Sequence, residues 1–186
     1  ASEAILLRMH RERGLPLVIF RPGIVIGRGG SPAHWGVGMW QHGSVCKVWG
    51  KGDNKLPLVL VEDVARGILS AVDAPDSIHG ESFNLVGGPL LSANEYLDEL
   101  ERIAGFKVQR HHPPIASFHA EAMFKWVVKM AVKHPDRTMP AYRDWASRTQ
   151  MAVFDCSKAR RVLGWQPEAD RARVIAAGIE AALPSL

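Results

Sequence analysis

Residues 14–27 read GLPLVIFRPGIVIG, in which a Pro-Gly break separates two short apolar runs. The first run, from Leu17 to Phe20, is continuous rather than alternating, as in strands that are buried on both faces of a parallel sheet. Residues 2–13, just upstream, repeat apolar side chains at helical spacing and predict a helix that stops at Gly14. This stretch therefore predicts a helix followed by a buried strand.

The alternation of helix and strand continues downstream. Residues 58–61 form another apolar run, and the acidic pair Glu62-Asp63 favours a helix that begins there and extends to Val72, because acids stabilise the positive end of a helix dipole. Residues 82–86 predict a further strand, which Gly87 ends. Strands that alternate with helices are typical of the α/β class.

The second half of the chain is mostly helical. Ser92 and Glu95 have the spacing of a capping box, which predicts a helix that runs to Ala104 and stops at Gly105. Apolar side chains at helical spacing predict a long helix over residues 115–132. Shorter helices are expected at residues 32–42, 155–163 and 171–183.

The composition restricts the functional classes. The chain has 186 residues, 47% of them hydrophobic, which fits one globular domain. A net charge of +4 allows nucleic-acid binding, but the basic residues are scattered and form no dense patch. The apolar runs are far shorter than the ~20 residues of a membrane span. Two cysteines, Cys46 and Cys156, lie far apart and suggest no disulfide framework, so we expect a reducing, cytoplasmic setting.

Recognisable catalytic motifs are missing from this sequence. Residues 27–30, GRGG, follow a strand but lack the full GxGxxG spacing that places a pyrophosphate on a helix N-terminus. A catalytic tyrosine with a lysine four residues later is also absent, since Tyr96 is followed at that spacing by Leu100 and Tyr142 by Ala146. No ligand spacing predicts a metal site. We therefore assign no catalytic or metal-binding residue.

Four strings together resemble a known family. They are residues 14–27, already quoted, residues 58–67 (LVLVEDVARG), residues 82–87 (SFNLVG) and residues 155–167 (DCSKARRVLGWQP). In this order they resemble the conserved strings of the NAD-dependent epimerase/dehydratase proteins, which are extended short-chain dehydrogenases.

The resemblance implies a fold and a position in it. In that family a catalytic YxxxK helix continues into the segment that residues 1–7 resemble, so its lysine would fall about one helical turn before Ala1. The chain is then the C-terminal portion of a Rossmann-type extended short-chain dehydrogenase, with parallel strands and a small, mostly helical substrate lobe. Residues 1–87 would hold the end of the Rossmann-type sheet with interleaved substrate-lobe segments, and residues 88–186 the substrate-binding lobe.

The resemblance also implies site residues. Pro22, Gly23, Ile24 and Val25 match the stretch whose backbone approaches the nicotinamide, and a glycine there leaves the main chain open to a ligand. The candidates for substrate contact are Arg28, Trp35, Arg143 and Arg148, since guanidinium groups suit phosphate or carboxylate and an indole can stack on a ring. Solvated surface arginines and a core tryptophan explain these four residues equally well.

Two departures from the family pattern concern the substrate. Nucleotide-sugar members commonly have an asparagine where this chain has Ile24, and often an arginine where it has Leu56-Pro57. Both differences favour a small-molecule substrate that is less polar, as in sterol-type or flavonoid-type relatives.

By the same resemblance, NAD or NADP would bind mainly through the missing N-terminal half. The intact protein would be a homodimer that packs residues 2–13 in a helical bundle. The chain alone would be inactive as an NAD(P)-dependent oxidoreductase. The alternative is a non-catalytic ligand-binding or assembly module derived from the same family.

Overall fold

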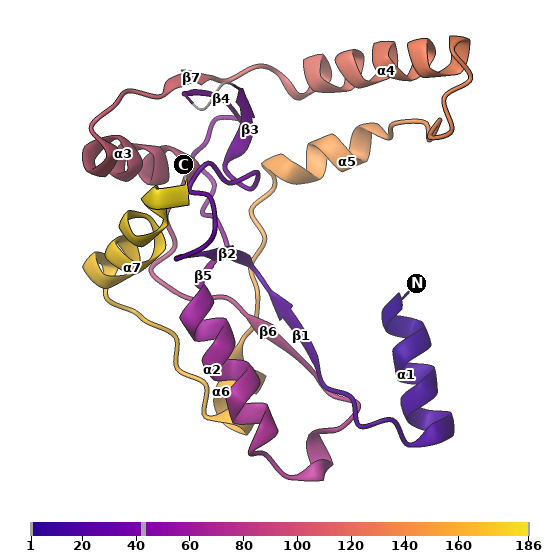
Figure 1. Cartoon of the computed structure of the whole chain (residues 1–186), viewed down its shortest axis with the longest axis vertical. Helices are drawn as coiled ribbons and strands as arrows, with labels where there is room; N and C mark the ends of the chain where they lie inside the picture. The colour runs from indigo at the N-terminus through magenta and orange to yellow at the C-terminus, as the bar shows by residue number, and fades with distance from the viewer. Residues whose placement is uncertain (1, 42–43, 186) are drawn as a thin grey trace. The chain divides into compact units, whose positions relative to one another are not determined.

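The computed structural model describes residues 2–41 and 44–185, and the chain divides into two compact units (Figure 1). Each unit is assembled from segments that are distant in sequence. Unit 1 contains Ala1–Pro32, Pro57–Leu90 and Val153–Ser185. Unit 2 contains Ala33–Leu56 and Leu91–Ala152.

Unit 1 is built on two pairs of parallel strands. Strand β1 (Ile19–Pro22) pairs with β6 (Ser82–Leu85), and β2 (Ile24–Ile26) pairs with β5 (Leu58–Leu60). All three residues of β5 are buried, as expected for a continuous apolar run in a parallel sheet. The predicted α/β class with parallel strands is confirmed.

Three helices of unit 1 begin and end within two residues of the prediction, whereas the helix predicted for residues 171–183 ends at Gly178 and is followed by a 3-10 turn. The helices of this unit are α1 (Ser2–Arg13), α2 (Val61–Val72), α6 (Ser157–Leu163) and α7 (Arg171–Gly178), with 3-10 turns η1 (Asp76–Ile78) and η3 (Glu180–Ser185). Helix α1 ends where the Gly14 N–H donates to the His10 carbonyl at 3.0 Å. Helix α2 contacts α6 and β5, and α6 also contacts β6 (Figure 1).

The core of unit 1 joins the strands to the C-terminal segment. Trp165 is 2% exposed, and its indole N–H donates to the Asp63 carbonyl at 2.8 Å. The buried cluster around it consists of Val59, Ile78, Phe83, Leu85, Val86, Cys156, Ala159 and Leu163. This packing is the reason that Val153–Ser185 belongs with the strands, whereas the sequence pattern grouped it with residues 88–186.

Unit 2 contains a three-stranded sheet, in which β4 (Val45–Val48) is antiparallel to β3 (Gly38–Gln41) and parallel to β7 (Gln109–His111). Strand β3 falls within the short helix predicted for residues 32–42, so that prediction was wrong, although His42 lies outside the described residues. Gly38 explains the difference. A Cβ there would lie 2.6 Å from both Cys46 Sγ and the Lys47 carbonyl oxygen, so the two strands approach closely at this glycine.

The helices of unit 2 are α3 (Ala93–Ala104), α4 (Ile115–Ala131) and α5 (Tyr142–Ala146), followed by the 3-10 turn η2 (Ser147–Thr149). The predicted capping box is confirmed, because the Ser92 hydroxyl accepts from the Glu95 N–H at 3.1 Å and the Glu95 carboxylate accepts from the Ser92 N–H at 2.6 Å. Gly105 ends α3 in the left-handed conformation, with φ of 73°. Among the helices of residues 2–41 and 44–185, none is long and apolar enough to cross a membrane.

Candidate functional site

Gly23 marks the point at which the first strand of unit 1 changes its partner. The Gly23 N–H donates to the Leu85 carbonyl beside β6 at 2.9 Å, and the next N–H, of Ile24, donates to the Pro57 carbonyl beside β5 at 2.7 Å. A Cβ on Gly23 would lie 2.0 Å from the same Pro57 oxygen. Because no side chain fits this gap, the sequence needs glycine here for close packing of the main chain.

An open groove follows this junction. It has a volume of about 360 Å³ and is lined by Val25, Ile26, Gly27, Arg28, Gly29, Gly30 and Val61. Gly27 has φ of 134°, and a Cβ on it would lie 2.8 Å from Val61 Cγ1, so glycine is required at the base of the turn. The volume falls within the range of small-molecule sites, which is about 300–1,000 Å³. This groove is the candidate site of unit 1.

The groove brings together two residues that the sequence analysis singled out for different roles. Val25, a predicted cofactor contact, is half-buried in it, whereas Arg28, a predicted substrate contact, is exposed. None of the ion pairs found within the described residues involves Arg28, so its guanidinium is available to an anion. Val61 also lines the groove, and sequence reasoning missed it because it looked like the last residue of a buried strand. The predicted roles themselves stay predictions.

A second arrangement lies in unit 2 around Arg148. Its guanidinium carbon is 5.4 Å from the ring centroid of Trp35, 5.2 Å from that of Trp49 and 5.6 Å from that of Trp145. These distances are those of cation–π contacts. The structure therefore joins two predicted substrate residues, Trp35 and Arg148. It leaves Arg143 apart, with 91% of its side chain exposed and Asp144 3.8 Å away.

Trp49 and Phe118 complete this aromatic cluster, and neither was predicted to belong to a site. The ring centroids of Trp49 and Phe118 are 5.0 Å apart, and Phe118 stacks on Trp145 at 5.8 Å. The rings come from the end of β4 and from helices α4 and α5, which are distant in sequence. Arg148 thus lies against an aromatic surface that only the tertiary structure assembles.

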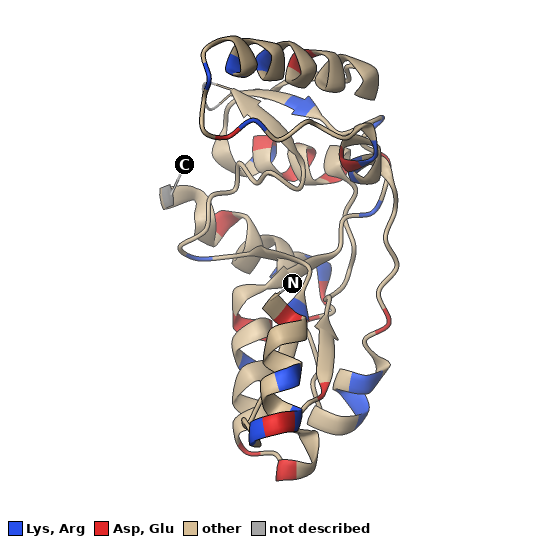
Figure 2. Cartoon of the chain, turned by 90° about the vertical axis from the view of Figure 1, so that its right-hand side faces the viewer, with Lys and Arg blue, Asp and Glu red and all other residues tan. Residues whose placement is uncertain are grey.

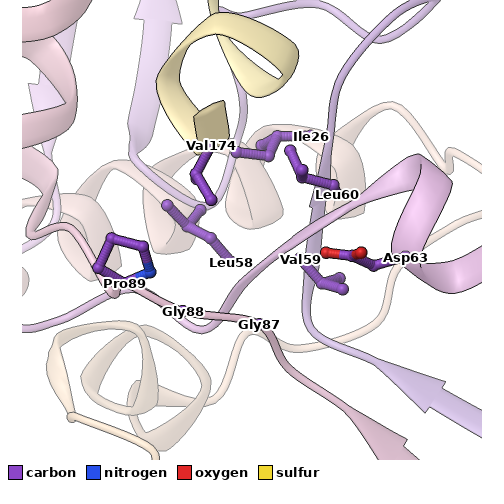
Figure 3. Close-up of a pocket in the computed structure, with 9 residues that line it drawn as sticks. All are labelled: Ile26, Leu58, Val59, Leu60, Asp63, Gly87, Gly88, Pro89 and Val174. Carbon is purple, nitrogen blue, oxygen red and sulfur yellow. The ribbon is translucent and has the colours of Figure 1, made fainter. Parts of the chain in front are cut away.

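Nine residues line a small cavity in unit 1, and Asp63 is the ionisable residue among them (Figure 3). Its volume of about 10 Å³ suits roughly one water molecule and is too small for a substrate. Asp63 is 1% exposed, and burial raises the pKa of its carboxyl group. The carboxylate accepts from the Glu168 N–H at 3.1 Å and pairs with Arg66. Asp63 therefore ties α2 to the C-terminal segment, which is a structural role.

A comparison with protein-family models finds one match. Residues 1–86 match the model of the NAD dependent epimerase/dehydratase family. That range contains the four parallel strands of unit 1 and the candidate groove. Among curated protein sequences, none matches the chain.

Solved structures match the fold along the whole chain. The UDP-glucuronic acid 4-epimerase of Bacillus cereus, in complex with UDP-glucuronic acid and NAD, is 16% identical with a TM-score of 0.67 over 100% of this chain and 51% of its own. An epimerase from Methanothermobacter thermautotrophicus is 17% identical, with a TM-score of 0.68 over 99% of this chain and 48% of its own. RMD from Pseudomonas aeruginosa, complexed with NADPH, is 17% identical, with a TM-score of 0.61 over 99% of this chain and 52% of its own. The chain thus spans about half the length of these proteins.

The prediction that this chain is the C-terminal portion of a family member was wrong. The family model matches it from residue 1 to residue 86, which is the part with the Rossmann-type parallel strands, and a missing N-terminal half is not supported. The prediction rested on the resemblance of residues 1–7 to the segment that follows a YxxxK helix and on two absent motifs. A short resemblance and an absent motif do not fix where in a longer fold a chain lies. Residues 1–86 match the NAD dependent epimerase/dehydratase family, and the whole chain has an α/β fold that resembles half of an extended short-chain dehydrogenase epimerase.

Proposed function

We propose that this chain is part of an NAD(P)-dependent oxidoreductase of the epimerase/dehydratase type, in which it forms one wall of the nicotinamide site and part of the substrate pocket. The observation that carries the proposal is the junction at Gly23, with the groove that follows it. The strand bends from one parallel partner to another and continues into a glycine-rich turn. Pro57 and Val61 fill the space beside Gly23 and Gly27, but a Cβ on Gly29 would meet nothing within 4 Å, so the main chain of the turn is open there to a flat ring.

In this proposal Pro22, Gly23, Ile24 and Val25 contact the nicotinamide, and Arg28 binds an anionic group of the substrate. The dinucleotide, when bound, supplies the hydride acceptor or donor. The chain's own groups orient the reactants and keep water away, which they do through half-buried apolar side chains such as Ile24 and Val25.

The chain by itself does not complete such a catalytic centre. The sequence contains neither a GxGxxG turn nor a tyrosine with lysine four residues later. The proton transfer that accompanies hydride transfer therefore needs groups that this sequence does not contain. We accordingly expect this chain alone to bind a dinucleotide weakly and to turn over nothing.

The substrate that we favour is a small molecule with a secondary alcohol or ketone. The solved relatives include an epimerase complexed with UDP-glucuronic acid and NAD and a protein complexed with NADPH. Ile24, which takes the place of a polar residue common in nucleotide-sugar members, favours a less polar substrate here. The cofactor that we propose is NAD or NADP.

Nuclear magnetic resonance tests whether this chain forms one wall of the nicotinamide site. The chain is labelled with ¹⁵N and titrated with NAD⁺ and, separately, with nicotinamide mononucleotide. The amide signals of Ile24, Val25, Gly27 and Gly29 should shift together, whereas that of Leu97, buried in unit 2, should stay in place. Shifts confined to unit 2, or none at millimolar ligand, would overturn the proposal.

Activity is tested on the natural protein that contains this sequence. Oxidation of hydroxysteroid, flavanol and nucleotide-sugar substrates is followed by NADH or NADPH formation. Arg28→Ala should raise KM for an anionic substrate, and Arg160→Ala on α6, also exposed, is the matched control. Dinucleotide binding without turnover of any substrate would instead favour a non-catalytic ligand-binding or assembly module.

A further inference from the structure

Helix α4 of unit 2 is apolar on two sides, yet only one side is packed. Its Phe118 side chain is buried and stacks within the aromatic cluster against Trp49 and Trp145. The outer side carries Phe124, which is 70% exposed, Val127 at 54% and Val128 at 46%. These positions are related by i, i+3 and i+4 spacing, so the three side chains form one stripe. A helix that is apolar around its circumference is normally covered on both sides.

Basic side chains accompany this stripe. Lys125 and Lys129, one helical turn apart on α4, are each ion-paired within the segment, with Glu121 at 2.6 Å and with Asp136 at 2.8 Å. Lys133 and Arg137 follow in the connection to α5; both are exposed, and neither belongs to an ion pair found within the described residues. Residues 121–142 contain these four basic residues and two acidic ones, Glu121 and Asp136. Lys and Arg positions recur along α4 in Figure 2.

The connection after α4 adds further exposed apolar groups close to the cations. Val132 is 67% exposed and Met139 is 63% exposed. The indole N–H of Trp126 donates to the Arg137 carbonyl at 2.9 Å, which holds the connection against the helix. The apolar stripe, the two exposed side chains and the cations therefore belong to one ordered segment, residues 121–142.

We propose that this segment docks unit 2 on an anionic membrane surface. The outer stripe of α4 would lie at the level of the acyl chains, and Lys133 and Arg137 would contact anionic headgroups. An interfacial helix of this kind needs an apolar face together with basic residues, and both are present. The net positive charge of residues 121–142 disfavours docking on a second copy of the same chain, because two such segments repel each other. The proposal does not depend on the oxidoreductase activity.

Vesicle co-sedimentation of the whole chain tests the proposal. Vesicles of phosphatidylcholine with about one third phosphatidylglycerol should bind the protein, and vesicles of phosphatidylcholine alone should bind it much more weakly. Phe124→Ser combined with Val128→Ser should lower the partition coefficient at least tenfold. The matched control, Leu69→Ser with Val72→Ser on α2, removes two similarly exposed apolar side chains from unit 1 and should leave binding unchanged.

The contribution of the basic side chains to vesicle binding is tested separately. Lys133→Gln with Arg137→Gln should lower binding to the anionic vesicles by about fivefold for each charge removed. Arg11→Gln with Arg13→Gln on α1, also exposed, is the control for net charge. Circular dichroism shows whether each variant is folded.

Absence of binding to anionic vesicles would overturn the proposal. So would equal losses in the α4 and α2 variants, which would indicate a non-specific apolar effect. Concentration-dependent dimers in light scattering that the α4 variant abolishes, without vesicle binding, would assign the stripe to a second copy of the chain instead.

Discussion

Gly23→Ala tests the close approach on which the junction of unit 1 depends. The added methyl group would lie 2.0 Å from the Pro57 carbonyl oxygen and 3.1 Å from Val86 Cγ2, so the main chain itself has to move. That movement disturbs the hydrogen bonds from the Gly23 and Ile24 N–H groups, at 2.9 and 2.7 Å.

The expected cost follows from these contacts. Each weakened main-chain hydrogen bond contributes about 1 kcal/mol, and overpacking adds about 1–3 kcal/mol. With two such hydrogen bonds, the free energy of unfolding of unit 1 should therefore fall by about 3–5 kcal/mol. The backbone dihedrals at Gly23 lie outside the left-handed region, so the loss comes from crowding rather than from an unfavourable φ.

Urea denaturation followed by circular dichroism measures this loss, and hydrogen exchange of the β1, β2 and β6 amides locates it in unit 1. Gly30→Ala is the matched control, because a Cβ there meets only the Gly27 carbonyl oxygen at 3.4 Å. It should change the free energy of unfolding by less than about 0.5 kcal/mol. Equal stability of Gly23→Ala and Gly30→Ala would refute the reasoning about the junction.

Three further predictions concern unit 2. Ser92→Ala should destabilise α3 by about 1 kcal/mol through loss of the capping box, measured by urea denaturation, and an unchanged midpoint would contradict this role. Arg148→Ala should lower stability by about 1–2 kcal/mol and change the tryptophan emission spectrum, because three indoles surround the guanidinium, whereas Arg148→Lys should lose less. Burial opposes ionisation of Glu101, but hydrogen bonds from Lys107, the Val108 N–H and Arg110 prevail and lower its pKa to about 2. Glu101 therefore contributes stability above its unfolded pKa of 4.5 that is lost as the pH falls toward 2, and Glu101→Gln should flatten the acid limb of the pH–stability curve in this window.

The local patterns of the sequence predicted most of the helices and strands correctly. Ser92, Glu95 and Gly105 predicted both ends of α3, and Gly14 predicted the end of α1. Such residues act on main-chain groups within a few positions, so their effect can be inferred without the rest of the fold. The prediction failed at Gly38, where a neighbouring strand determines the local conformation, and at α5, which was not predicted.

The candidate site was predicted only in part. Pro22–Val25 were recognised from the resemblance of residues 14–27, and Arg28 was proposed from the loop that follows them. The structure places Val25 and Arg28 in one groove. The sequence could not show the contribution of Val61, because a groove is formed by segments that lie close only after folding. The cofactor and substrate roles of these residues stay predictions.

The sequence by itself determined the α/β class, the ends of several helices and the glycines that allow tight turns, because these features depend on neighbouring residues. Only the tertiary structure decided that Val153–Ser185 packs with the parallel strands, that three indoles surround Arg148 and that one side of α4 is uncovered. These features depend on contacts between residues up to about a hundred positions apart, such as Asp63 and Trp165. Hydrophobic packing selects such contacts by shape and burial, which the local pattern of a sequence does not contain.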